Sequence, residues 1–429
     1  MAKISKELQK LKELIREDYE ETLIELTEKN LNIYIEVFSE IQEKASYISD
    51  IRNTGYVIHD LENILIIIIL ALLSNCDTYV QIAIFVEEHK NLIKKILKIK
   101  GELPSKSTIR AVVTLIEPTQ LEKVCREIIY KFIIEKTPIY EDEELIIEDI
   151  KSMDGKTANA SSRSNSKNGK VKKVNAMSLY SVKQDTCEAT LFIPDKTNEI
   201  PSGPKLLEFI NIENCIITFD ALNTQIDTIS YIKSRKAHYV APVKGNQECL
   251  MEYIKLYFDD KELFNIAKQE SYLVKTEIGH YGPEKREYIF SNNIKKFENI
   301  ELWKGLKSIG VAKRTYTTKN GETQVDTRYY ISDIDASKIE LLSNAIRNEW
   351  GVENKLHYYL DMVFKEDNNK CFAENSQKNL NILRKFVLDI LKIYKKESKL
   401  SLNAIRFKIS INFEKELGLI LKSLKNNLK

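Results

Sequence analysis

The sequence predicts a mixed α/β protein in which a strand-rich middle region is flanked by helical regions. Apolar residues recur at helical spacing up to about residue 140, and short β-branched or aromatic runs alternate with helix patterns from residue 145. Helical periodicity returns at residue 336 and continues to the C-terminus. A chain of 429 residues is long enough for two or three domains, each with its own core.

Composition narrows the class of protein. Charged residues make up 30% of the chain and leave a formal net charge of +2, so any basic surface must be local. The six cysteines form no CxxC pair, which argues against a structural zinc site and favours a reducing compartment. The apolar run Ile64–Leu73 is too short to span a bilayer. We therefore expect a soluble, cytoplasmic protein with no membrane partner.

Residues 1–140 are predicted to form a helical N-terminal region. Residues 1 to about 30 are typical of an exposed amphipathic arm, and 64–73 of a buried helix. A break at Gly101–Ser105 precedes a Ser-capped helix that carries Lys106 and Arg110. This pattern is compatible with a DNA-binding helix-turn-helix, although helical bundles contain many such junctions.

The strand-rich region begins with a strand that leads into Asp154. No acidic residue occurs between residues 156 and 175, whereas six basic residues do: Lys156, Arg163, Lys167, Lys170, Lys172 and Lys173. A basic loop beside a carboxylate is expected where phosphates are drawn to a metal site. A solvated hairpin loop would explain the composition equally well.

A second strand, Cys215–Phe219, delivers Asp220 at its carboxyl end. Such a position is typical of a catalytic or metal-binding carboxylate in α/β enzymes, and equally of a helix cap. The order of strands and helices from 150 to 243 is that of an RNase H-like fold, whose core is a mixed five-stranded sheet with flanking helices. In that fold Asp154 and Asp220 would be neighbours, and two close carboxylates favour a bound Mg²⁺.

A β-rich insertion is expected at about 270–335, because four strand patterns are separated by glycine-containing turns. The helix that follows carries Glu353 and His357 one turn apart. We expect a catalytic domain over residues 145–390 and a basic helical C-terminal tail over 391–429.

Several stretches resemble transposases of the ISAs1 type, a family that includes the H-repeat-associated proteins and is related to the IS4 group. The matching stretches are Asp154–Lys156, Lys196–Pro201, Phe219–Gln225, Lys244–Gln247 and Trp350–His357, continued by Leu360–Asp361 and Phe364–Asp367. Gly101–Ile109 also resembles the N-terminal associated region of that family. The resemblance covers roughly residues 50 to 390.

The resemblance implies a DDE transposase that cleaves DNA and transfers strands at the ends of an insertion sequence. Asp154, Asp220 and Glu353 would be the catalytic acids and the ligands of two Mg²⁺ ions, with Mn²⁺ as a substitute. Double-stranded DNA, namely terminal inverted repeats and target, would be the partner of a homodimer in the synaptic complex. The protein would be bacterial and nucleoid-associated when bound to DNA.

This chain departs from the IS4-type signature on the helix of Glu353. Glu349 stands where a phosphate-gripping arginine is frequent, and Leu360 where a lysine is frequent. Glu349 is therefore an alternative third acid. We expect DNA contacts from Lys156, Arg163, Lys172, Lys173, Lys244, Asn246, Arg347, Lys355, Lys106 and Arg110. Trp303 could stack on a base, although a core position is the commoner one for tryptophan.

Two other functions remain open from the sequence. The chain could be an inactive or domesticated relative that binds DNA without cutting it. It could also be an RNase H-like nuclease that cleaves DNA without strand transfer.

Overall fold

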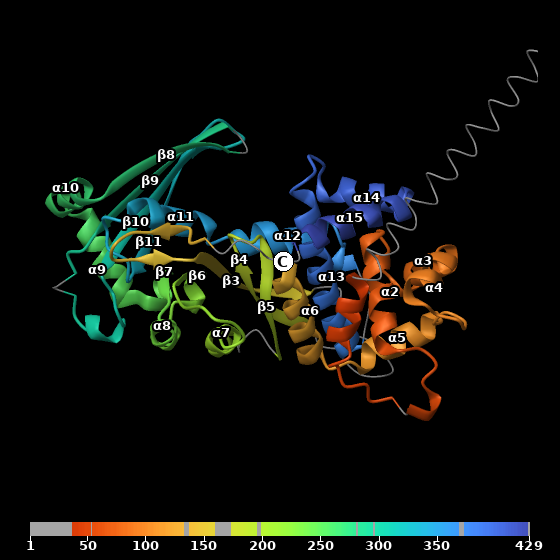
Figure 1. Cartoon of the computed structure of the whole chain (residues 1–429). Helices are drawn as coiled ribbons and strands as arrows, with labels where there is room; N and C mark the ends of the chain where they lie inside the picture. Colours follow the sequence, from red (N-terminus) through yellow and green to blue (C-terminus); the bar gives the residue numbers. More distant parts are fainter. Residues whose placement is uncertain are drawn as a thin grey trace, which may run out of the picture. The chain divides into compact units, whose positions relative to one another are not determined.

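The computed structural model describes residues 37–427 apart from 53, 133–136, 159–172, 195–198, 280–281, 295–296 and 369–372. The predicted N-terminal arm lies outside the described residues. The chain divides into two compact units (Figure 1). Unit 1 comprises residues 1–134, 363–365 and 373–429, and unit 2 comprises residues 135–362 and 366–372. No helix among the described residues is long and apolar enough to cross a membrane.

Unit 1 is helical, as expected. Its helices are α2 Leu61–Leu73, α3 Tyr79–Glu88, α4 Lys90–Leu97, α5 Lys106–Leu115, α6 Pro118–Phe132, α13 Glu374–Lys395, α14 Leu402–Ile411 and α15 Phe413–Asn427. Every residue of α2 from Ile64 onward is buried, which confirms the buried helix predicted there. Ser105 caps α5 through a hydrogen bond from the Thr108 amide.

The C-terminal residues belong to the helical unit. α13 packs against α5, α6 and α15, and it buries side chains around most of its circumference. The expected domains, a catalytic domain over residues 145–390 and a basic tail over 391–429, stay predictions; α13 crosses that boundary and lies in unit 1. Helical periodicity shows that α13 exists, but it does not show which neighbouring helices cover it.

Unit 2 is built on a nine-stranded mixed sheet. The strands are β3 Asp149–Ala158, β4 Val174–Ser181, β5 Thr186–Ile193, β6 Cys215–Phe219, β7 His238–Val243, β8 Tyr272–Gly279, β9 Gly282–Ser291, β10 Ser308–Thr317 and β11 Thr323–Ser332. Their spatial order is β5-β4-β3-β6-β7-β11-β10-β9-β8. β3, β6 and β7 are parallel neighbours, and the other pairs are antiparallel. A separate short ladder joins β1 Tyr140–Glu141 to β2 Ile146–Ile147.

The predicted mixed α/β class is confirmed, and so is the central pairing of β3 with β6. The strands predicted as a β-rich insertion continue the same sheet, because β11 pairs with β7 in register Tyr329↔Val243. That pairing satisfies the backbone groups of an edge that β7 would otherwise expose. The insertion therefore enlarges the core sheet.

Helices cover the two faces of this sheet. α7 Glu199–Leu207, α8 Ile226–Ser234, α9 Glu248–Asp259 and α10 Lys261–Glu270 pack on one face, in the core that contains Met153 and Ile217. α11 Ile339–Asn348 packs on the other, in the core that contains Ile150 and Ile216. We call this second side the α11 face. Side chains two residues apart on a strand share a face, which settles where the strand-end residues point.

Candidate active site

Three neighbouring parallel strands carry polar residues: Asp154 lies within β3, Asp220 directly follows β6, and Lys244 directly follows β7. Ile150, Ile216 and Val240 point into the core of the α11 face. Counting on in steps of two along β3, β6 and β7 places the two aspartates and the lysine on that same face. The last pair of the β3–β6 register is Met153↔Phe219, so Asp154 and Asp220 are the next residues on the two neighbouring strands, and β3 continues to Ala158.

Asp220 is held by the turn that follows it. Its Oδ1 accepts hydrogen bonds from the backbone N of Asn223 at 3.2 Å and from Asn223 Nδ2 at 2.8 Å. The side chain thus caps the short 3-10 turn Ala221–Asn223, which confirms the capping alternative. The described hydrogen bonds of this carboxylate use only Oδ1. Capping is therefore compatible with the other predicted role of Asp220, a catalytic or metal-binding carboxylate.

The loop after β7 braces that turn. Asn246 Nδ2 donates to Ala221 O at 2.8 Å, and Gln247 Nε2 donates to Thr224 O at 2.9 Å. Asn246 was expected to contact DNA; its side chain is exposed, its amide nitrogen binds the protein backbone, and the DNA contact stays a prediction. In the structure Asn246 is a positioning residue for the Asp220 turn.

α7 packs closely behind the two strand ends. A Cβ on Gly155 would lie 2.5 Å from Glu199 Oε1, and a Cβ on Gly203 would lie 3.2 Å from Met153 Cε. Glycine at both positions therefore lets the helix approach β3. Glu199 belongs to the matching stretch Lys196–Pro201, and the structure places its side chain beside Gly155. Residues 196–198 of that stretch lie outside the described residues.

The helical segment that carries Glu353 runs alongside β3. The Val352 amide donates to Ser152 Oγ at 3.0 Å, and Lys156 Nζ donates to Asp361 Oδ1 at 2.5 Å. From Val352 to Asp361 the helical segment advances nine residues, or about 13.5 Å, and from Ser152 to Lys156 the strand advances four residues, or about 13 Å. The two elements therefore cover the same length between the two contacts. The contacts fix this segment lengthwise against the strand of Asp154.

His357 lies between those two contacts. Its Nδ1 is 3.5 Å from Asp154 Oδ2, and its Nε2 is buried without a hydrogen-bond partner in the described part of the chain. His357 was expected to be a packed or hydrogen-bonding helix residue. Its burial and its position against Asp154 agree with that expectation.

Glu353 opens a π-helical segment, Glu353–His357, closed by a hydrogen bond from the Tyr358 amide to Glu353 O. Such turns are rare and are found frequently at functional sites. The Glu353 side chain is exposed. Among the described residues no three His, Cys, Asp or Glu side chains are grouped closely enough to hold a metal ion. The structure therefore pairs Asp154 with Asp220 but does not close a ligand set with Glu353.

Glu349, the alternative third acid, has a different environment. It is 7% exposed, accepts a hydrogen bond from Tyr330 Oη at 3.1 Å, and lies 3.8 Å from an Arg328 nitrogen. Burial raises its pKa to about 7, against the favourable charges of Arg328 and Lys244, and the charge of Asp220 adds to the rise. Glu349 is a buried, partnered carboxyl, whereas Glu353 is open to solvent.

The side chains of the predicted DNA-contacting cations differ in ion pairing and in exposure to solvent. Lys156 is paired with Asp361 and lies 3.4 Å from Glu366, and Arg347 is paired with Glu277 at 3.0 Å. Arg347 is exposed all the same, as are Lys244 and Lys173 in unit 2 and Lys106 and Arg110 on α5 of unit 1, while Lys355 is half-buried. Arg163 and Lys172 lie outside the described residues.

The two tryptophans have opposite environments. Trp303 is 5% exposed and packs in the core with the α7 side of the sheet, so the expected base-stacking surface is not there. Trp350 is 42% exposed, and the Arg328 guanidinium lies 4.3 Å from its ring centroid. Sequence reasoning gave no role to Arg328, Ser152 or Asn223, although Asn223 belongs to the matching stretch Phe219–Gln225.

Comparison with known proteins defines the class. The model of the Transposase DDE domain matches residues 142–390, and that of the DDE_Tnp_1-associated region matches residues 43–129. The chain belongs to the DDE transposase family, and its resemblance to the H-repeat-associated proteins is confirmed.

Two curated relatives from Escherichia coli cover most of the chain. "Putative transposase YncI" of strain O157:H7 is 30% identical over 400 residues, which are 90% of this chain and 98% of that protein. "H repeat-associated putative transposase YhhI" of strain K12 is 30% identical over 355 residues, 82% of this chain and 90% of that protein. A solved piggyBac transposase synaptic complex with hairpin DNA shows a TM-score of only 0.36 at 12% identity over 94% of this chain and 82% of that one.

Proposed function

We propose that the chain is an active transposase with an RNase H-like core, which cleaves DNA at the ends of an insertion sequence and joins the released strand to target DNA. The observation that carries this proposal is the placement of Asp154 and Asp220 on adjacent parallel strands, just beyond the last β3–β6 pair and on the face along which the Glu353 segment is fixed. Family membership supplies the reaction class.

The donor chemistry fits a divalent metal. Carboxylate oxygens are the ligands that Mg²⁺ and Mn²⁺ prefer, and the Asp154 side chain is 29% exposed on the α11 face. Asp154, Asp220 and Glu353 would hold two such ions. Bound metal would supply activation of the attacking oxygen and stabilisation of the departing one.

The other residues of the site position these acids. Asn223 restrains Asp220, and His357 borders Asp154. Lys244 stands exposed on the same face and would attract a DNA phosphate. Lys156 neutralises Asp361 and Glu366, which keeps those two carboxylates from competing for cations.

The test is a cleavage and strand-transfer assay with Mg²⁺ and DNA carrying the terminal repeats that flank the gene. Wild type should give nicked and joined products, and Asp154→Asn and Asp220→Asn should give neither while still binding DNA. Products of nicking without joining would indicate a nuclease. Binding without any product, equal in wild type and Asp220→Asn, would indicate a DNA-binding relative that no longer cuts.

We also propose that unit 1 binds double-stranded DNA through Lys106 and Arg110 at the start of α5, and that the active complex is a homodimer. Both side chains are exposed. Charge removal at both positions should weaken duplex binding and reduce its salt dependence. Lys123→Ala, an exposed lysine of the same unit, is the control. Light scattering with and without terminal-repeat DNA tests the dimer, and fluorescence imaging of the tagged protein tests association with the nucleoid.

A further inference from the structure

The nine-stranded sheet ends in an edge strand, β8, whose outer side is paired with no described strand. β8 is the last strand in the spatial order, and among the described strands it pairs with β9 alone. Figure 1 shows β8 along the outer border of the sheet. An edge of this kind presents a row of backbone N–H and C=O groups that can pair with a strand of another chain.

The outward backbone groups of β8 belong to its even-numbered residues. The Phe290 amide donates to Ser271 O at 3.2 Å, which extends the β8–β9 register by one pair. Residues that bond to the neighbouring strand alternate along an antiparallel pair, so the odd-numbered residues of β8 bond to β9. Val274, Thr276 and Ile278 therefore direct their N–H and C=O groups away from the sheet.

β8 lacks the features that commonly prevent edge strands from pairing. Natural edges are frequently blocked by proline, by a bulge or by a very short strand. β8 has eight residues, contains no proline and keeps an unbroken register with β9. Two of its outward residues are apolar and accessible: Val274 is 39% exposed and Ile278 is 93% exposed. Such a strand favours pairing with another strand over remaining in water.

The two charges of β8 are complementary in an antiparallel pair of two copies. Lys275 and Glu277 flank Thr276, and both side chains contact α11 on the α11 face. When Thr276 of one copy lies opposite Thr276 of the other, each Lys275 lies opposite a Glu277. The same alignment places Val274 opposite Ile278, so apolar side chains also meet apolar ones.

Other symmetric alignments of this strand are disfavoured by charge. A pair centred on Lys275 brings two lysines together, and a pair centred on Glu277 brings two glutamates together. Like charges directly opposite each other destabilise a sheet. A pair centred on Val274 places Lys275 opposite Leu273. The charge pattern therefore selects Thr276 as the centre.

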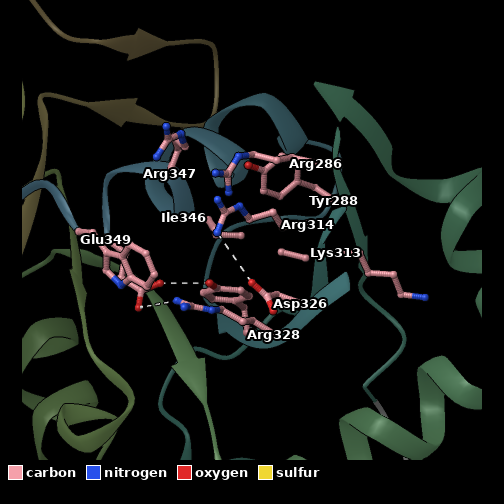
Figure 2. Close-up of a pocket in the computed structure, with 12 residues that line it drawn as sticks. Arg286, Tyr288, Lys313, Arg314, Asp326, Arg328, Ile346, Arg347 and Glu349 are labelled. Carbon is pink, nitrogen blue, oxygen red and sulfur yellow. Dashed lines mark hydrogen bonds and ion pairs between the residues drawn. The ribbon is translucent and has the colours of Figure 1, made fainter. Parts of the chain in front are cut away.

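Contacts with α11 hold the two charges in place. Lys275 Nζ lies 3.0 Å from Glu340 Oε2. Glu277 Oε2 lies 3.0 Å from Arg347 Nη2 and 3.5 Å from Arg286 Nε, and Figure 2 shows these two arginines beside the ribbon of α11. An ammonium group has several donors and a carboxylate has several acceptor sites, so each charge can bind a further partner across the pair.

We propose that β8 is the interface between two copies of this chain, which pair antiparallel about Thr276 and join their sheets into one. The same surface is used by both copies, as a two-fold symmetric dimer requires. The inference rests on the proposed function in that an active complex of two copies is expected there. It goes further because it names the strand that joins them, and it holds without DNA.

One proline tests the backbone bonds of the interface. Thr276→Pro removes an N–H that β9 does not use, so β8 keeps its place in its own sheet while the central bonds between copies are lost. Thr276→Ala, the matched control, removes the side chain and keeps the N–H. Full-length protein in EDTA without DNA is followed by light scattering and sedimentation equilibrium.

We expect concentration-dependent dimers for wild type and Thr276→Ala, and a dissociation constant at least about tenfold higher for Thr276→Pro. A wild type that stays monomeric would overturn the proposal. So would a Thr276→Pro variant that dimerises like wild type with an unchanged circular dichroism spectrum.

Charge reversal tests the partner without touching the backbone. Lys275→Glu and Glu277→Lys each place like charges opposite one another, so each variant alone should be monomeric at concentrations where wild type is dimeric. An equimolar mixture of the two should form heterodimers, because every opposed pair is again of opposite sign. Homodimers of either variant, or a mixture that stays monomeric, would refute pairing through these residues.

A cross-link tests the alignment. Opposed residues in a hydrogen-bonded antiparallel pair have Cα atoms roughly 5.5 Å apart, so mild oxidation of Thr276→Cys should give a covalent dimer. Val274→Cys should give none, because its counterpart lies four residues further along the strand, or about 13 Å away. Wild type oxidised in parallel accounts for the native cysteines, of which Cys249 is exposed. Cross-linking of Val274→Cys in place of Thr276→Cys would overturn the alignment.

None of these measurements uses DNA or metal, so their outcome is separate from cleavage. A chain that cleaves terminal-repeat DNA but never pairs through β8 refutes the interface alone. A chain that pairs through β8 but never cleaves refutes the proposed activity alone.

Discussion

The ring nitrogen Nδ1 of His357 lies 3.5 Å from Oδ2 of Asp154, and the contact joins the segment of Glu353 to the middle of β3. A group that orients a metal-binding carboxylate typically accounts for 10–100-fold in metal affinity. We therefore expect His357→Ala to raise the Mg²⁺ concentration needed for half-maximal cleavage by roughly that factor, without loss of DNA binding.

His357→Gln, which keeps a polar group near Asp154, should be milder. Tyr358→Phe, at the exposed neighbouring position, is the control and should behave like wild type. An unchanged Mg²⁺ dependence in His357→Ala would show that the contact has no part in orienting the acid.

The identity of the third acid can be decided by a matched pair of variants. Glu353 is exposed on the π-helical segment, whereas Glu349 is buried against Tyr330. We expect Glu353→Gln to reduce cleavage to background with DNA binding intact, because ligation is lost without added bulk. Glu349→Gln should retain cleavage. The reverse result would reassign the third acid to Glu349.

Glu349 should also make stability depend on pH. Its pKa is raised from the ordinary 4.5 to about 7 in the folded chain, so the folded state binds this proton more tightly than the unfolded state. Stability should therefore fall as pH rises from about 4.5 to about 7, by up to about 3 kcal/mol. Urea denaturation of wild type and Glu349→Gln over this range is the measurement. The variant should have a flatter profile, and identical profiles would contradict the raised pKa.

Gly310 is required by an aromatic neighbour on the next strand. It pairs with Phe290, whose ring atoms would lie 2.4 Å from an added Cβ. Phe290 is fully buried, so its ring has little room to move. We expect Gly310→Ala to destabilise the protein by about 1–3 kcal/mol, measured by chemical denaturation. Gly101→Ala, where a Cβ meets nothing within 4 Å, should be nearly neutral.

Arg406 is a buried charge on which the helical unit depends. It is 1% exposed, pairs with Asp77 at 2.7 Å and donates to Leu72 O. Removing one partner of such a pair costs about 3–5 kcal/mol, because the other charge stays buried. Arg406→Met should therefore lower stability strongly, and Asp77→Asn in the same chain should restore part of the loss. Additive effects of the two changes would show that the pair is not coupled.

The sequence alone was enough to predict the class of fold and the positions of the two aspartates. A run of β-branched and aromatic residues that ends in Asp220 predicts a buried strand with a polar end, because such side chains pack well in a sheet, and a second strand pattern leads into Asp154. The long apolar run at α2 was identified as a buried helix for the same kind of local reason. Local periodicity and strand order were sufficient for these features.

Tertiary structure decided how distant segments meet. Pairing of β11 with β7 turned the predicted insertion into part of one sheet and aligned Arg328 with Lys244. The tertiary structure also buries Trp303, leaves Trp350 exposed and places the Asn246 amide against the backbone of Ala221. These outcomes depend on strand pairing and packing between residues far apart in the chain, whereas periodicity and turn signals report only on neighbours within a few residues. The sequence therefore determined the candidate catalytic side chains, and the fold decided which of them lie close together.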